Sequence, residues 1–98
     1  MGRSRRLESG FQDRLIADIK KEFPESMVFK MDHPQGIPDI LILNNDKWAS
    51  LECKREPNAK HQPNQDYYVK KMDEMSFSRF IHPENREEVL NELYATLR

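Results

Sequence analysis

The sequence predicts a single α/β domain whose elements follow in the order helix, three strands, helix, strand and helix. Three patterns support this fold class. An amphipathic helix pattern covers residues 7–23, two strand patterns follow at 38–43 and 48–54, and further helix patterns begin near Pro63 and Pro83. A chain of 98 residues is long enough for one small core, so we expect one domain.

The first helix is predicted from apolar residues that recur at steps of three and four, up to Pro24, which cannot continue a helix. The stripe consists of Leu7, Phe11, Leu15, Ile16, Ile19 and Phe23. Glu8 and Gln12 lie one turn apart beside this stripe, so both are candidates to reach a site at its edge. Residues 1–6 are rich in arginine and are predicted to form a flexible basic arm.

A β-prone run at 26–31 and a loop with Pro and Gly at 32–38 lead to the two neighbouring strands. The run at 40–43 is apolar on both faces, as in a central strand, and Asn44-Asn45-Asp46 provides a turn. We therefore expect these two strands to form a hairpin.

Side chains alternate between the two faces of a strand, which separates the residues of the second hairpin strand into two sets. Ala49, Leu51 and Cys53 are predicted to enter the core, whereas Glu52 and Lys54 share the opposite face. Cys53 is the only cysteine, so the chain has no internal disulfide, and its thiol is expected to behave as a small buried apolar group.

Two more helices and a strand complete the prediction. Pro63 suits the first turn of a helix, whose core face would contain Gln65, Tyr68, Val69, Met72 and Met75. A short strand is expected at 77–81. Pro83 then opens a third helix with acidic residues near its N-terminus, namely Glu84, Glu87 and Glu88, and a core face of Val89, Leu90, Leu93 and Leu97.

The charge and hydropathy of the chain limit the classes of function. A net charge of −1 argues against a protein that coats nucleic acid through bulk positive charge, although Lys54, Arg55 and Lys60 form a local basic cluster. No apolar run approaches the roughly 20 residues that span a bilayer, and the basic start lacks the apolar region of a secretory signal. We therefore expect a cytoplasmic protein that does not contact a membrane.

Asp39, Glu52 and Lys54 together form the pattern of a metal-dependent nuclease site. Two carboxylates, with the Cys53 backbone carbonyl, provide the oxygen ligands that Mg²⁺ prefers. A lysine beside them can orient a water molecule and stabilise negative charge on the phosphoryl oxygens. An acid-x-lysine triplet alone is more often an ordinary surface ion pair. Its position at the end of a hairpin, after a helix that carries Glu8, favours the nuclease interpretation.

In order, spacing and strand context, Pro38-Asp39 and Glu52-Cys53-Lys54 resemble the motif of the PD-(D/E)XK nuclease superfamily. Gly36-Ile37-Pro38-Asp39, Leu51-Glu52-Cys53-Lys54-Arg55 and Gln65 also resemble the compact virus-type replication-repair nuclease (VRR-NUC) branch, which includes phage-encoded domains. The resemblance implies a restriction-endonuclease-like core with a mixed sheet flanked by helices, and the host cytoplasm as the location of a phage protein.

The resemblance also implies the roles of individual residues. Asp39 and Glu52 would be metal ligands, Lys54 the catalytic lysine and Gln65 a supporting residue. Gln62 competes with Gln65 for that role. Cys53, through its carbonyl, and Glu8 would complete the metal site, with Gln12 as the alternative to Glu8.

The implied cofactor is Mg²⁺, for which Mn²⁺ can substitute, and the implied substrate is DNA. Because so small a chain could hardly grip two strands alone, we expect a homodimer that cuts branched, junction or flap DNA. Two other classes stay open. One is a binding module that keeps the fold without catalysis, and the other is a subunit that acts only with a helicase or packaging partner.

Overall fold

The computed structural model describes the backbone of residues 2–98 and the side chains of residues 10–98. Its elements are α1 (Gly2–Glu22), β1 (Met27–Lys30), β2 (Ile40–Asn44), β3 (Lys47–Cys53), α2 (Gln65–Met75), β4 (Ser78–Ile81) and α3 (Arg86–Leu97). This sequence of elements confirms the predicted order and the α/β class. None of the helices in the described part of the chain has the length and apolar character that a membrane span requires.

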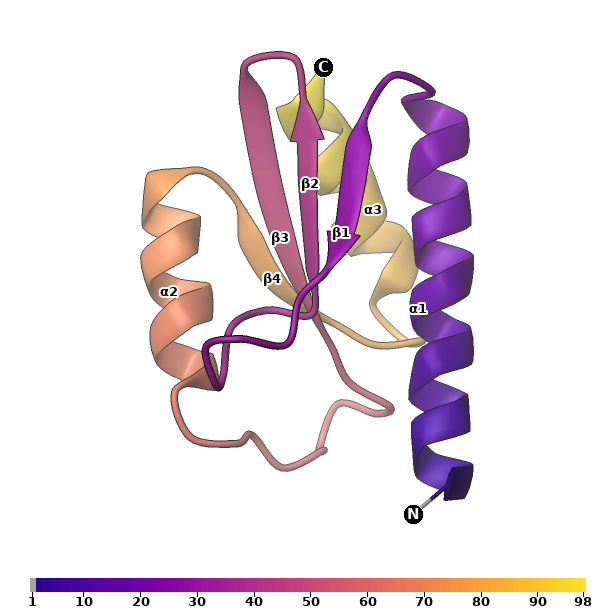
Figure 1. Cartoon of the computed structure of the whole chain (residues 1–98), viewed down its shortest axis with the longest axis vertical. Coiled ribbons are helices and arrows are strands. Elements are labelled where there is room, and N and C mark those ends of the chain that lie inside the picture. The colour runs from indigo at the N-terminus through magenta and orange to yellow at the C-terminus, as the bar shows by residue number, and fades with distance from the viewer. Residues whose placement is uncertain (1) are drawn as a thin grey trace.

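The four strands form one mixed sheet in the order β1-β2-β3-β4 (Figure 1). β2 is antiparallel to both β1 and β3, and β3 is parallel to β4. The predicted hairpin is confirmed, because Asn44 pairs with Lys47 across a two-residue turn in which Asn45 has a positive φ of 57°. The parallel pair requires a crossover, and α2 provides it.

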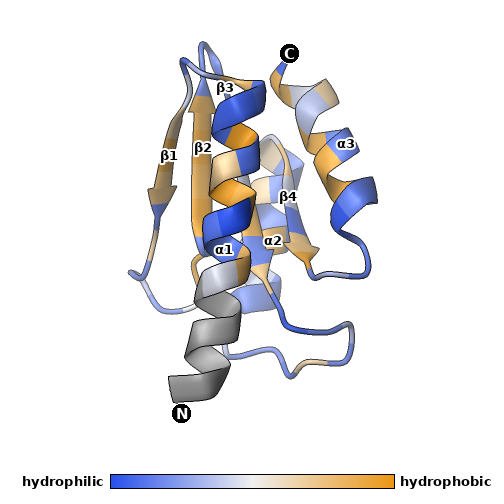
Figure 2. Ribbon diagram, turned by 90° about the vertical axis from the view of Figure 1, so that its right-hand side faces the viewer, coloured by the Kyte–Doolittle hydropathy of each residue, from blue (hydrophilic) through white to orange (hydrophobic). Residues whose placement is uncertain are grey.

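The helices lie in two layers, with α1 and α3 on one face of the sheet and α2 on the other (Figures 1 and 2). The register of the hairpin pairs Ile40 with Leu51 and Ile42 with Ala49. These four side chains are fully buried in the main core. The structure confirms that the predicted apolar stripes of the first and last helices enter the core. The core contains Phe11, Leu15, Ile19 and Phe23 of the first stripe and Val89, Leu90, Leu93 and Leu97 of the last.

The face of the sheet under α2 is more polar. Ser50 donates a hydrogen bond to Ser78 Oγ at 2.7 Å and also lies 3.8 Å from the Met72 sulfur. The strand alternation that buries Leu51 and Cys53 in the main core places Glu52 on this second face. Glu52 is therefore directed toward the layer that α2 occupies.

Several predicted helix boundaries are wrong. α2 begins at Gln65 rather than at Pro63, because Asn64 has a left-handed backbone with φ 73°. α3 begins at Arg86, so Pro83 and Glu84 lie in the preceding turn, where the His82 N–H donates to Asn85 Oδ1 at 2.8 Å. Only Glu87 and Glu88 of the expected acids are in its first turn.

The predicted core face of α2 and the predicted arm also differ from the structure. Met75 is 66% exposed, because at 100° per residue it lies about 120° around the helix from the buried Val69. α1 continues through residues 2–6, where the sequence predicts an arm. The side chains of Leu7 and Glu8 lie outside the described residues.

Candidate functional site

Asp39, Glu52, Lys54 and Gln65 meet at one end of the sheet. Asp39 comes directly before β2, Glu52 lies in β3, Lys54 follows β3, and Gln65 is the first residue of α2. The antiparallel register brings the start of β2 beside the end of β3, and the Cys53 N–H donates to Asp39 Oδ2 at 2.9 Å. The hairpin thus fixes Asp39 against the acid-x-lysine segment.

Glu52 is a buried carboxyl with one oxygen satisfied and one without a partner. Its exposed fraction is 2%. Oε2 accepts a hydrogen bond from Gln65 Nε2 at 2.8 Å, whereas Oε1 is buried with no hydrogen-bond partner. An unsatisfied buried oxygen is costly and uncommon in folded proteins. Oε1 can therefore accept a further ligand, such as a water molecule or a cation.

Burial, followed by the negative charge of Asp39, raises the pKa of Glu52 from 4.5 to about 8, while the positive charge of Lys54 acts in the opposite direction. Two neighbouring carboxylates repel each other when both are ionised. A proton on one of them, or a cation between them, relieves this repulsion. The pair is thus arranged to hold positive charge.

Lys54 is held in place by three hydrogen bonds and an ion pair although it lies beyond the last strand residue. Its backbone N–H donates to Ile81 O at 2.8 Å, which ties it to β4. Its ammonium donates to Gln65 Oε1 at 2.6 Å and to Lys60 O at 3.1 Å, and it lies 3.9 Å from Glu52 Oε2. Only 8% of the residue is exposed, so the ammonium has a fixed position beside the carboxylates.

Gln65 joins the lysine and the glutamate through the two ends of one amide. Its Oε1 accepts from Lys54 Nζ and from the Gln62 backbone N–H, at 2.6 and 2.8 Å, while its Nε2 donates to Glu52. Gln62 contributes this backbone group rather than its side chain. Of the two glutamines left open by the sequence, the structure brings the Gln65 side chain into contact with the charged pair.

A cavity of about 250 Å³ borders Asp39, Glu52, Lys54 and Gln65. A ligand can therefore reach these four residues from the surface of the protein. The cavity is lined by Gln12, Asp39, Glu52, Cys53, Lys54, Ala59, Lys60, Gln62 and Gln65. Gln12 is thus the described residue of α1 that reaches the site. The Glu8 side chain lies outside the described residues, so both Glu8 and Gln12 remain candidates for the site residue of the first helix.

The residues around this cavity fit a divalent cation that binds oxygen. Asp39 and the unpartnered Oε1 of Glu52 are hard oxygen ligands, and Mg²⁺ needs only one or two protein carboxylates because it keeps several water molecules. Within residues 10–98 there is no group of three or more His, Cys, Asp or Glu side chains that could hold a metal. The Cys53 side chain is buried in the core, so this residue can contribute only through its backbone.

Sequence reasoning missed the role of the chain between β3 and α2. The Lys60 carbonyl accepts from Lys54, and Ala59 lines the cavity. This segment has no periodic pattern, and its Pro57, Asn58 and Pro63 indicate only a loop, without showing where that loop runs.

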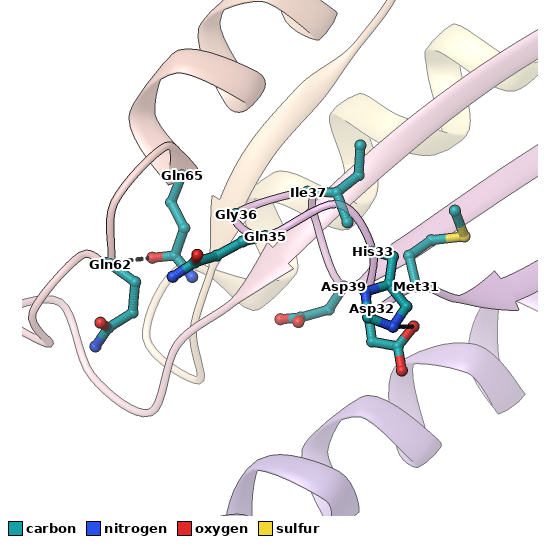
Figure 3. Close-up of a pocket in the computed structure, with 9 residues that line it drawn as sticks. All are labelled: Met31, Asp32, His33, Gln35, Gly36, Ile37, Asp39, Gln62 and Gln65. Carbon is teal, nitrogen blue, oxygen red and sulfur yellow. Dashed lines mark hydrogen bonds and ion pairs between the residues drawn. The ribbon is translucent and has the colours of Figure 1, made fainter.

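A second cavity of about 410 Å³ adjoins the first and shares Asp39, Gln62 and Gln65 with it (Figure 3). Its other wall is the loop at 31–37. In Figure 3, Gln35 extends from this loop toward the wall formed by Gln62 and Gln65, and the Asp39 carboxylate points between the two walls. The site is therefore a groove with two compartments that meet at Asp39.

Comparison of the chain with protein-family models, with curated proteins and with solved structures found no match. The functional interpretation consequently depends on the motif and on the geometry of these side chains.

Proposed function

We propose that this chain is a metal-dependent DNA endonuclease with a restriction-endonuclease-like core, related to the VRR-NUC branch of the PD-(D/E)XK superfamily. The α/β architecture, with a mixed sheet covered by helices on both faces, is compatible with that core. The proposal extends to hydrolysis of phosphodiester bonds in branched, junction or flap DNA.

One observation carries the proposal. The Gln65 amide links Lys54 to Glu52 beside Asp39, at the edge of a surface cavity. A solvated ion pair would need neither this burial nor an unpartnered carboxylate oxygen. Ionisable groups with strongly shifted pKa values in a cavity are typical of functional sites.

The divalent cation would be held by Asp39, Glu52 and the Cys53 carbonyl, with Glu8 or Gln12 as a further contact. When bound, Mg²⁺ or Mn²⁺ polarises the phosphoryl oxygens and makes a water molecule a stronger nucleophile. The residues of the chain orient the reacting groups around it. Lys54, fixed by Gln65 and Lys60 O, is positioned to stabilise negative charge that develops on the phosphate.

The test is nicking of supercoiled plasmid by D39A, E52A and K54A, with K47A as the matched control, because Lys47 lies at the opposite end of β3. We expect each site variant to lose at least about 100-fold in rate, as loss of one charge-stabilising group does in other enzymes. K47A should cut like the wild type. Circular dichroism shows whether the variants fold, and activity retained in all three folded variants would refute the proposal.

A second candidate function is supported by the residue at the first-helix position. Gln12, an amide, lines the cavity, and the described residues supply only two carboxylates there. This favours a nucleic-acid-binding module without catalysis, or a subunit that requires a helicase or packaging partner. Such a protein would bind DNA with or without Mg²⁺ and would not cut it. The Q12E variant separates the cases, since an added carboxylate should strengthen Mg²⁺ binding only at a metal site.

We also propose that the active form is a homodimer, because one domain of 11.7 kDa offers little surface beyond the site for a second strand. Light scattering at micromolar concentration should give twice the mass of one chain. A mass of one chain at that concentration would contradict this part of the proposal.

A further inference from the structure

We infer that the second cavity is a subsite for an unpaired nucleobase, the base of a nucleotide next to the phosphate that is cut. This inference rests on the proposed function and specifies the substrate of that site. The two cavities share Asp39, so a phosphate at the carboxylate pair has its own nucleotide within reach of the second compartment.

The two compartments differ in charge in the way that a nucleotide requires. The first is lined by Lys54 and Lys60 as well as by the carboxyls of Asp39 and Glu52, and its lysines attract phosphate. The residues that line the second include no lysine or arginine, and they include the acids Asp32 and Asp39. Because its lining offers no lysine or arginine, the second compartment favours a neutral base over a phosphate.

The lining of the second cavity also suits a base. Met31 and Ile37 are apolar residues of its lining, and Gln35 and Gln62 provide amides. An amide donates and accepts in the geometry of a base edge, and single-stranded bases are read through their Watson–Crick edges. A paired base has that edge occupied, so the cavity selects a nucleotide that is splayed out of a duplex. Its volume of about 410 Å³ lies within the range of about 300 to 1,000 Å³ for ligand sites.

The loop that forms the outer wall is fixed in place before any ligand arrives. The Met31 N–H donates to Asp39 O at 2.7 Å, which closes the base of the loop. At its tip, Gly36 has φ 90°, and a Cβ there would lie 2.6 Å from Asn64 Cβ and 2.7 Å from Pro63 O. The backbone at Gly36 thus packs closely against the start of α2, and the neighbouring Gln35 extends toward Gln62 and Gln65 in Figure 3.

The test is a double-mutant cycle between the protein and the substrate. Binding of a labelled flap oligonucleotide is measured by anisotropy in Mg²⁺, with K54A used to prevent cutting, while abasic sites replace the unpaired nucleotides one at a time. We expect one abasic position to weaken binding by about 5- to 10-fold, as loss of a base contact does elsewhere. In K54A/Q35A the same abasic site should cost less than about twofold.

The matched control is K54A/N91A, because Asn91 is an exposed amide on α3, away from both cavities. It should keep the full abasic penalty. An abasic penalty that is equal in K54A/Q35A and K54A, or that appears at no position, would overturn the inference. Cutting of the unmodified oligonucleotide by wild-type protein is measured in parallel, so failure of the subsite and failure of the nuclease proposal give different results.

Discussion

At the scale of single residues, the site depends on one amide that satisfies two charged groups. The sequence brought Gln65 forward as a candidate, in competition with Gln62, because it shares the predicted helix face of Tyr68 and Met72. Its two partners could not be predicted, since they depend on how α2 is placed over β3. The Lys60 carbonyl was also beyond prediction, because backbone contacts from an aperiodic loop leave no side-chain pattern.

Replacement of Gln65 should disturb the site far more than replacement of Gln62. Q65A removes the acceptor of Lys54 and the donor to Glu52, so we expect a 10- to 100-fold lower cleavage rate, the usual effect of losing an orienting partner at a metal site. Q62A keeps the backbone N–H that contacts Gln65 and should stay within about threefold of wild type on a fully paired plasmid. The measurement is the initial rate of plasmid nicking. Equal losses in the two variants would show that cleavage does not depend on the Gln65 amide between Lys54 and Glu52.

The buried Glu52 predicts a pH dependence of stability in metal-free protein. Its pKa is 4.5 in the unfolded chain and about 8 in the folded one, so between these values the folded state binds more protons. The stability that the protonated carboxyl contributes is fully present below pH 4.5 and is lost as pH rises through 8. Urea unfolding in chelator should therefore show falling stability across this window.

The E52Q variant is the control for that measurement, because its amide stays neutral. Groups that do not interact with Glu52 titrate equally in the two proteins, so the difference between them isolates Glu52 together with the Asp39 carboxyl beside it. The difference in unfolding free energy should change with pH only between about 4.5 and 8. A constant difference across this range would contradict the shifted pKa.

At the scale of elements, the predicted order of helices and strands is confirmed, and the errors are the helix starts and the assignment of Met75 to the core face of α2. Pro63 and Pro83 suit a first helical turn by their fixed φ, yet Asn64 adopts a left-handed conformation and Asn85 forms a turn with His82. The Asn85 side chain accepts a hydrogen bond from the His82 N–H, and Asn64 packs beside Gly36 of a loop far away in the sequence. The loop contact at Gly36 also escaped prediction, because it joins segments that are far apart in the sequence.

The Gly36 contact predicts a large effect from a single methyl group. G36A should destabilise the protein by about 1–3 kcal/mol, because φ 90° strains any L-residue and the Cβ would collide with Pro63 and Asn64. G10A is the matched control, since that Cβ would only touch the flexible Arg14 side chain at 3.4 Å. Alanine in the helix should even stabilise by up to about 1 kcal/mol. Urea denaturation compares the two, and equal effects would exclude a tight contact at Gly36.

At the scale of the whole molecule, a cation that binds the folded state alone should raise thermal stability. With Mg²⁺ at ~100 times its Kd the gain is roughly 2.7 kcal/mol, or about 10 °C or more for a domain of this size. D39N should abolish the gain, because an amide keeps the acceptor for the Cys53 N–H but removes the charge. Scanning fluorimetry at constant ionic strength measures both, and an equal shift in D39N would mean that the ion binds elsewhere.

The most direct test of the central claim is cleavage of a four-way junction and of supercoiled plasmid by pure protein, with Mg²⁺, with Mn²⁺ and with chelator, beside K54A. We predict cutting by the wild type in either metal, none in chelator, recovery when Mg²⁺ is restored, and loss in folded K54A. Wild-type protein that binds these DNAs but does not cut them in either metal would contradict the claim, and cutting that persists in chelator or in K54A would show that this site is not the catalyst.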